Sequence, residues 1–304
     1  MIAAAYLAAE GFETALADEL YRAGVAIDAW HGRLALSPDP PMAAAWALDT
    51  WTAAQEFSVA SIKGGADALR AIQRNWSSYA VGHHRRMALI EGRLPPVKAR
   101  KLVFPEPAPA SHLGAWTLLA SDRMLASATK TSAFVNGACA FEEDHIGPPS
   151  RAYLKLWEAL TRLGEHPRSG ETCLDLGASP GGWTFVLASL GARVTAVDKA
   201  PLAPNVAAMP GVTFQDGSAF AVEPAPVDWL VCDVIAYPDR LLALVRRWVA
   251  AGAARRIVCT IKFQGETDHD SAAAFAAIPG GQVMHLFHNK HELTFCWRNP
   301  AATG

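Results

Sequence analysis

The chain has 304 residues, of which 51% are hydrophobic and 18% are charged, and its formal net charge is −2. This length allows about two domains, and the composition is that of a globular protein, which excludes an intrinsically disordered chain. The near-neutral charge excludes a uniformly basic nucleic-acid-binding protein, so any RNA contact must come from a local basic surface.

The first elements along the chain predict a small α+β module. Residues 2–8 are expected to form a strand, residues 12–23 a helix with Gly24 at its C-terminal cap, and residues 25–36 extended structure. This strand–helix–strand order is typical of a compact α+β unit, which we place at residues 1–75.

The middle of the chain is dominated by a basic stretch. Residues 42–80 show no clear periodicity, the basic stretch runs from residue 83 to residue 101, and residues 115–130 predict two strands around a turn. Such a stretch can contact phosphates, although it can equally be a solvated loop or helix face. The candidate RNA-binding residues are Arg85, Arg86, Lys98, Arg100 and Lys101.

Beyond a polar linker at residues 142–150, predicted strands and helices alternate, which favours a parallel, doubly wound α/β sheet. Only residues 289–291 separate the last two strands, so that pair must be antiparallel. The strands are expected at 171–177, 193–198, 212–216, 227–233, 255–262, 282–288 and 292–297, and the helices at 151–163, 182–190, 238–250 and 269–277.

A glycine loop joins the first strand and helix of this α/β region. The segment CLDLGASPGGW (173–183) ends a strand and opens a helix, which is where nucleotide-like ligands bind in such sheets. Asp198 ends the next strand, roughly 20 residues further on, where an acid can accept hydrogen bonds from a ribose diol. The alternative for Asp198 is an ordinary turn acid.

The loop favours S-adenosylmethionine over a dinucleotide. It lacks the GxGxxG pattern, and Pro180 removes one N–H donor that a pyrophosphate would need. S-adenosylmethionine carries no phosphate and tolerates this loss. Asp216 ends the third strand, where it could accept a hydrogen bond from an adenine amino group or simply form an Asp-Gly turn.

At this point the motifs DLGASPGGW, VDWLVCD, TIK and HELTF resemble those of the FtsJ-type ribose 2′-O-methyltransferases. The segments PSRAYLKLWEAL and YLAAEGFETALADEL resemble the RlmM type, which methylates a cytidine ribose of large-subunit (23S) rRNA. The resemblance implies a Rossmann-like methyltransferase domain at 148–304 with an antiparallel last strand. It also implies an N-terminal α+β RNA-recognition region, ferredoxin-like and THUMP-like, with a reduced THUMP-like part at 76–147.

The resemblance also assigns the site. The family's Lys-Asp-Lys-Glu tetrad falls on Lys155, Asp233, Lys262 and Glu292. A further family contact falls on Ala152, which lacks the hydroxyl of the family's serine. The candidate cofactor-binding residues, including the rest of the glycine loop, are Gly177, Ser179, Pro180, Gly181, Gly182, Trp183, Asp198, Asp216 and Asp233.

Four charged residues of this kind suit methylation of a hydroxyl. A ribose 2′-hydroxyl is a poor nucleophile until a neighbouring base takes its proton, and a lysine can do so only as a neutral amine. Burial and a second nearby cation both favour the neutral amine, whereas carboxylates orient it. We therefore expect S-adenosylmethionine-dependent 2′-O-methylation of RNA, with 23S rRNA or a pre-ribosomal precursor as the partner.

Two alternatives remain at this point. The substrate could be another RNA or hydroxyl compound, or the chain could be a non-catalytic RNA-binding or ribosome-assembly protein that retains the methyltransferase fold. The intact tetrad argues against the second alternative. Methylation of a base is disfavoured because VCDVIAYP stands where an Asn/Asp-Pro-Pro-Tyr motif would be needed.

Other residue patterns indicate a cytoplasmic protein without a metal or membrane partner. The five cysteines form no CxxC pair, and the N-terminus lacks a signal peptide's basic segment. No stretch approaches the length of a membrane span. Six histidines lack carboxylate or thiol partners at metal-ligand spacing: His83, His84, His269, His285, His288 and His291.

Overall fold

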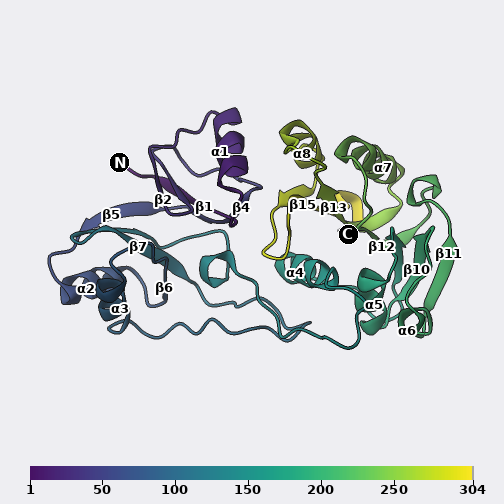
Figure 1. Cartoon of the computed structure of the whole chain (residues 1–304), viewed down its shortest axis with the longest axis horizontal. Helices are drawn as coiled ribbons and strands as arrows, with labels where there is room; N and C mark the ends of the chain where they lie inside the picture. Colours follow the sequence, from purple (N-terminus) through teal and green to yellow (C-terminus); the bar gives the residue numbers. More distant parts are fainter. Residues whose placement is uncertain (303–304) are drawn as a thin grey trace. The chain divides into compact units, whose positions relative to one another are not determined.

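The computed structural model describes residues 1–302, which divide into two compact units (Figure 1). The first unit contains Met1–Leu102 and Ala108–Ala140, and the second contains Val103–Pro107 and the chain from Phe141 onward. The sequence instead placed boundaries at 75/76 and 147/148. The predicted boundary at 75/76 lies inside the first unit, because one sheet of this unit contains strands from both sides of that boundary.

The first sheet of the N-terminal unit has the strand order β2-β3-β1-β4, and neighbouring strands pair antiparallel. Its elements are β1 (Ala4–Ala8), α1 (Glu13–Arg22), β2 (Ala29–His31), β3 (Leu34–Ser37) and β4 (Ala47–Trp51). Gly24 follows the end of α1 and has a φ of +74°, the left-handed conformation that is typical of a glycine after a helix. The predicted C-terminal cap is therefore present.

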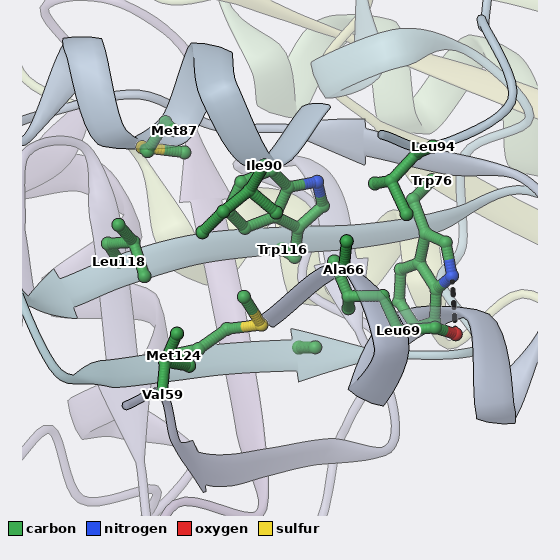
Figure 2. Close-up of a cluster of buried hydrophobic side chains, with 11 residues drawn as sticks. Val59, Ala66, Leu69, Trp76, Met87, Ile90, Leu94, Trp116, Leu118 and Met124 are labelled. Carbon is green, nitrogen blue, oxygen red and sulfur yellow. Dashed lines mark hydrogen bonds between the residues drawn. The ribbon is translucent and has the colours of Figure 1, made fainter. Parts of the chain in front are cut away.

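The second sheet of this unit has the order β5-β8-β7-β6 and carries two helices. Its elements are β5 (Ala54–Ser58), α2 (Ile62–Ile72), β6 (Trp76–Ser78), α3 (His84–Glu91), β7 (Gly114–Ala120) and β8 (Arg123–Ser127), followed by the 3₁₀ turn η1 (Val135–Gly137). Figure 2 shows the core between these helices and strands, including the Trp76 indole N–H that donates to the Leu69 carbonyl at 3.0 Å. The two strands predicted over residues 115–130 are present as β7 and β8, which pair antiparallel.

The second unit is built on a seven-stranded sheet of order β11-β10-β9-β12-β13-β15-β14. The strands from β11 to β13 are parallel, whereas β15 is antiparallel to both of its neighbours. This is the Rossmann-like arrangement with an antiparallel last strand that the sequence predicted. The strands are β9 (Thr172–Leu176), β10 (Arg193–Asp198), β11 (Val212–Asp216), β12 (Val227–Cys232), β13 (Ala254–Lys262), β14 (Gly281–Met284) and β15 (Glu292–Arg298).

Helices cover both faces of this sheet, with α4 and α5 on one side and α7 and α8 on the other (Figure 1). They are α4 (Tyr153–Leu163), α5 (Gly182–Ser189), α6 (Pro204–Ala207), α7 (Pro238–Ala251) and α8 (His269–Ala276), with 3₁₀ turns η2 (Ala219–Ala221) and η3 (Pro300–Ala302). In this unit the predicted helices and strands agree with the structure to within a few residues, apart from the penultimate strand.

That strand was predicted over 282–288, but β14 ends at Met284. Residues 285–291 instead form a loop whose backbone is hydrogen-bonded to α4.

All five cysteines are buried and free, and burial raises the pKa of the Cys232 and Cys296 thiols to about 12. Within residues 1–302, no helix has the length and apolar character needed to cross a membrane.

Candidate active site

A cavity of about 370 Å³ opens where the parallel strands of the second unit end. Its volume lies within the range of small-molecule sites, and strand carboxyl ends are where ligands bind in open α/β sheets. The residues that line it are Ser150, Ala152, Gly177, Ala178, Ser179, Pro180, Gly182, Trp183, Asp198, Asp233, Val234, Ile235 and Lys262.

Two glycines allow the loop after β9 to approach its neighbours closely. Gly177 has a φ of +76°, and an added Cβ would lie 2.8 Å from the Val234 Cα. Gly181 has a φ of +115°, and its Cβ would lie 2.9 Å from a methyl of Val206. Both the backbone conformation and the available space therefore require glycine at these two positions. The loop consequently presents backbone atoms to the cavity at these positions.

Asp198 is oriented by backbone N–H groups on both sides of its carboxylate. Ser179 N donates to Oδ2 and Ala200 N donates to Oδ1, each at 3.0 Å. Each carboxylate oxygen can accept a further hydrogen bond, so a pair of ligand hydroxyls could bind here. Trp183 closes the adjacent wall, where its indole N–H donates to the Ala152 carbonyl at 2.9 Å.

The four tetrad residues meet beside this cavity. Lys155 Nζ lies 2.8 and 2.9 Å from the two oxygens of Asp233 and 3.3 Å from Glu292 Oε1. Lys262 Nζ lies 3.0 Å from Asp233 Oδ1 and donates to the Asp233 carbonyl at 2.5 Å. Two lysines therefore share one carboxylate, and the second carboxylate contacts Lys155.

The fold explains why these residues meet although they lie far apart in sequence. Lys262 and Glu292 are direct partners in the antiparallel register of β13 and β15. Asp233 follows β12, which is the parallel neighbour of β13. Lys155 comes from α4, which packs against β15. Only the sheet order and the antiparallel last strand together bring the four charges to one place.

Asp175 is a fully buried carboxylate at the end of β9, below the glycine loop. Burial raises its pKa to about 7, and the nearby charges of Asp233 and Asp198 act in the same direction. A hydrogen bond of 2.6 Å from the Thr184 hydroxyl to Asp175 Oδ2 opposes this rise. The group is therefore largely protonated below neutral pH.

Some predicted site residues lie outside the cavity. Gly181 caps α5, and Asp216 is exposed at the end of β11, where it pairs in register with Asp198. The five basic candidates all belong to the first unit. Arg85 and Arg86 lie on α3, where Arg86 also donates to the Val59 carbonyl, and the remaining three are exposed: Lys98, Arg100 and Lys101.

Four residues that line the cavity were not among the predicted site residues, namely Ser150, Ala178, Val234 and Ile235, although Ala178 lies within the predicted glycine loop. Ser150 belongs to the PSR segment, and Val234 and Ile235 directly follow Asp233, so their proximity to recognised motifs was the available signal. In residues 1–302, no group of three or more His, Cys, Asp or Glu side chains could hold a metal ion.

Comparison with known proteins bears on this region. The family model of FtsJ-like methyltransferases matches residues 148–289. Two relatives are each named ribosomal RNA large subunit methyltransferase M. The protein of Halorhodospira halophila is 40% identical over 163 residues, which cover 51% of this chain and 48% of the relative. That of Laribacter hongkongensis is 40% identical over 175 residues, which cover 51% and 49%.

The chain therefore spans about half the length of the curated relatives that it matches. The matched region contains the glycine loop, every strand of the seven-stranded sheet except β15, and three of the four tetrad residues; Glu292, at the start of β15, lies three residues beyond the end of the family match. Residues 148–289 of this chain are thus similar to the FtsJ-like methyltransferases and to the ribosomal RNA large subunit methyltransferase M proteins.

Proposed function

We propose that this chain transfers a methyl group from S-adenosylmethionine to a ribose 2′-hydroxyl of RNA. The observation that carries the proposal is the position of Lys262. Its amine lines the cavity at the strand ends and contacts Asp233, which in turn contacts Lys155. A base at the wall of a nucleoside-sized cavity suits deprotonation of a hydroxyl.

The residues around the cavity fit S-adenosylmethionine. The Asp198 carboxylate is pre-oriented to accept two ribose hydroxyls, and the wall at Gly177 and Pro180 offers few N–H donors for a phosphate. When bound, S-adenosylmethionine supplies an electrophilic methyl group on a sulfonium sulfur. Asp216, at the end of the adjacent strand β11, is the candidate acceptor for the adenine amino group.

Lys262 is the candidate general base. Lys155 has two carboxylate partners, whereas Lys262 shares one of them, which favours Lys262 as the amine that takes the proton. Its Nζ accepts the 2′-hydroxyl proton as the 2′-oxygen forms its bond to the methyl carbon and the methyl–sulfur bond breaks, with the electron pair of that bond staying on sulfur. Nζ later releases the proton to solvent. Lys155 and Glu292 orient Asp233 and limit the net charge of the cluster.

The proposed substrate is large-subunit ribosomal RNA, methylated at a cytidine. Support comes from the names of the relatives and from the resemblance of the PSRAYLKLWEAL segment to the RlmM type. The exposed basic residues of the first unit are the candidate phosphate contacts. Methylation of another RNA remains the alternative, and it would use the same four residues.

Two substitutions at one position test the base assignment. Lys262→Ala removes the amine, and Lys262→Arg keeps a positive charge that cannot be lost near neutral pH. We expect both variants to lower single-turnover methyl transfer to ribosomal RNA by roughly 10²- to 10⁴-fold. Cofactor affinity, measured by calorimetry, should change by less than about tenfold in either variant, which is under 1.4 kcal/mol.

Retention of near-normal turnover in Lys262→Arg would contradict the assignment, because it would show that Lys262 acts only through its charge. If the unmodified protein binds S-adenosylmethionine but labels no RNA, the non-catalytic alternative is favoured instead.

A further inference from the structure

A second buried charge on α4 lies one turn beyond Lys155. Glu158 is fully buried, and both of its carboxylate oxygens accept hydrogen bonds from outside their own helical turn. Oε1 accepts from Arg162 Nε at 2.7 Å and from Phe287 N at 2.9 Å. Oε2 accepts from His288 N at 3.0 Å and from His288 Nδ1 at 2.8 Å.

These contacts keep Glu158 ionised despite its burial. Burial alone raises the pKa of a carboxyl group, but the hydrogen bond from His288 and the charge of Arg162 outweigh it and leave the pKa below its usual value. A buried carboxylate that accepts four hydrogen bonds is strongly held in one place. Glu158 therefore fixes the backbone at residues 287 and 288 to α4.

The segment that Glu158 holds leads directly to Glu292. Lys290 O accepts from Glu292 N at 2.8 Å, and the Asn289 side-chain amide donates to Glu292 O at 3.2 Å. His285 adds a contact across the same loop, between its Nε2 and Lys290 O at 3.0 Å. The position of residues 287 and 288 is thus transmitted through a short, internally bonded loop to Glu292.

We propose that Glu158 and His288 form a positioning pair that holds loop 285–291, and through it Glu292, against Lys155. The helix α4 then contacts the last hairpin twice, once through Glu158 and once through the ion pair of Lys155 with Glu292. The pair sets the geometry of the tetrad before any ligand binds. This inference rests on the proposed function for its effect on turnover, but not for its effect on the loop.

The opposite end of the same two strands supplies an internal control. Arg256 and Arg298 face each other in the register of β13 and β15, six residues from the pair formed by Lys262 and Glu292. Glu165 contacts both arginines, at 2.7 and 2.6 Å. Glu165 therefore anchors the strand pair as Glu158 anchors the loop, but at the end away from the tetrad.

The chemistry of His288 allows a conservative test. Nδ1 is the ring atom that faces Glu158, and an asparagine side chain can place its amide N–H near that position, whereas leucine cannot donate at all. If donation to Glu158 is what matters, His288→Asn should rescue what His288→Leu loses. Glu158→Gln places an amide N–H where a carboxylate oxygen accepted and so breaks part of the cluster.

The experiment compares Glu158→Gln, His288→Leu, His288→Asn and Glu165→Gln in the full chain. We expect Glu158→Gln and His288→Leu to lower kcat by about 10- to 100-fold with KM for S-adenosylmethionine within about threefold of the unmodified value, because misplacement of a catalytic group mainly affects turnover. His288→Asn should recover most of kcat. Glu165→Gln should lower thermal stability and leave kcat within about threefold.

Amide hydrogen exchange provides a readout that needs no turnover. Exchange at Phe287, His288 and Glu292 should become at least about tenfold faster in Glu158→Gln than in Glu165→Gln. Equal exchange in these two variants overturns the inference even if the protein proves to have no methyltransferase activity. Unchanged kcat in both Glu158→Gln and His288→Leu, beside an inactive Lys262→Ala, overturns it while the proposed function stands.

Discussion

Each unit of the molecule contains a buried cluster of lysine and carboxylate groups, and the two clusters differ in how completely they are satisfied. In the first unit, Lys130 and Asp49 have side chains that are 1% and 0% exposed. Lys130 Nζ donates to Asp49 Oδ2, to the Ser132 carbonyl and to the Phe134 carbonyl, at 2.6 to 2.7 Å. All three of its N–H groups are used within the protein.

In the second unit, Lys262 is 20% exposed, shares its carboxylate with Lys155 and lines a cavity. Its two contacts within the cluster both go to Asp233. We call the pair Lys130–Asp49 saturated, because all three N–H groups of the lysine are hydrogen-bonded within the protein. A saturated pair can only hold the chain in place, whereas two lysines that share a carboxylate beside a cavity leave an amine available to a ligand. The same residue types therefore point to a stabilising role in the first unit and to a catalytic role in the second.

The largest effect on stability is expected at the saturated pair. Lys130→Met removes the cation and leaves Asp49 buried without it, which should lower the free energy of unfolding by about 3–5 kcal/mol. Lys262→Met should cost clearly less, because Lys155 still compensates Asp233. Denaturant unfolding of both variants measures the difference. Equal losses of stability would remove the distinction between the two clusters.

Asp175 extends the comparison to a buried carboxylate whose pKa is raised. Its folded pKa of about 7 exceeds the unfolded value of about 3.9, so the folded state binds the extra proton between these values. The contribution of Asp175 to stability should therefore fall as pH rises from about 4 to about 7, by roughly 1.4 kcal/mol per pH unit, and level off above this range.

Asp175→Asn should abolish that fall, so its stability relative to the unmodified protein should increase across the same window. Asp216→Asn, which changes an exposed carboxylate of the same sheet, is the control and should give a flat difference. Chemical denaturation at pH 5, 6, 7 and 8 measures both. A flat difference for Asp175→Asn would show that the carboxyl is ionised throughout.

A smaller effect is expected at Asp198, on the side of the cavity where we propose that the cofactor binds. Asp198→Ala removes an oriented carboxylate that could accept two ribose hydroxyls, and charged hydrogen bonds contribute about 1.5–3 kcal/mol each. We expect S-adenosylmethionine affinity to fall by at least about tenfold by calorimetry. Lys130→Met, in the other unit, should leave that affinity unchanged at temperatures where it is folded. An unchanged affinity in Asp198→Ala would place the cofactor elsewhere.

The smallest effect concerns the basic residues of the first unit. Neutralising Lys98 or Lys101 with glutamine should weaken RNA binding several-fold and reduce the slope of log affinity against log salt by about 1 each. Arg168→Gln, which neutralises an exposed arginine of the second unit, should leave the slope unchanged. A slope that is unchanged in both lysine variants would remove this stretch from the RNA-binding surface.

The second unit could be predicted closely from sequence because its signals are local. Strands with buried apolar runs alternate with helices, of which α4 and α7 are clearly amphipathic, and the glycine loop lies between strand β9 and helix α5. The exception was β14, whose predicted length included residues 285–288. The backbone N–H groups of Phe287 and His288 donate to Glu158, about 130 residues earlier in the chain, and no local pattern could reveal that.

The first unit resisted prediction for similar reasons. Strand β4 contains Asp49 and Thr50, both buried, because Asp49 pairs with Lys130, 81 residues away. Helix α2 contains Gly64 and Gly65, which lower helix propensity. An added Cβ at Gly65 would lie only 3.0 to 3.1 Å from side-chain atoms of neighbouring elements, so tertiary packing accounts for the residue.

The site itself was predicted through motifs, whereas its geometry depends on the sheet. Lys262 and Glu292 face each other only because β15 inserts antiparallel beside β13. Glu158 could have been identified from sequence, because Lys155 and Glu158 are the two charged residues of the otherwise apolar helix segment LKLWEAL. A charge at a buried helix position requires a partner, although the sequence does not say which.

We propose that the second unit methylates a ribose hydroxyl of large-subunit ribosomal RNA through Lys262. The most direct test incubates the protein with methyl-labelled S-adenosylmethionine and ribosomal RNA that has not been modified, and then digests the RNA to nucleosides. We expect label in one 2′-O-methylated nucleoside, a cytidine, and none with Lys262→Ala. Label on a base, or equal label with Lys262→Ala, would contradict it.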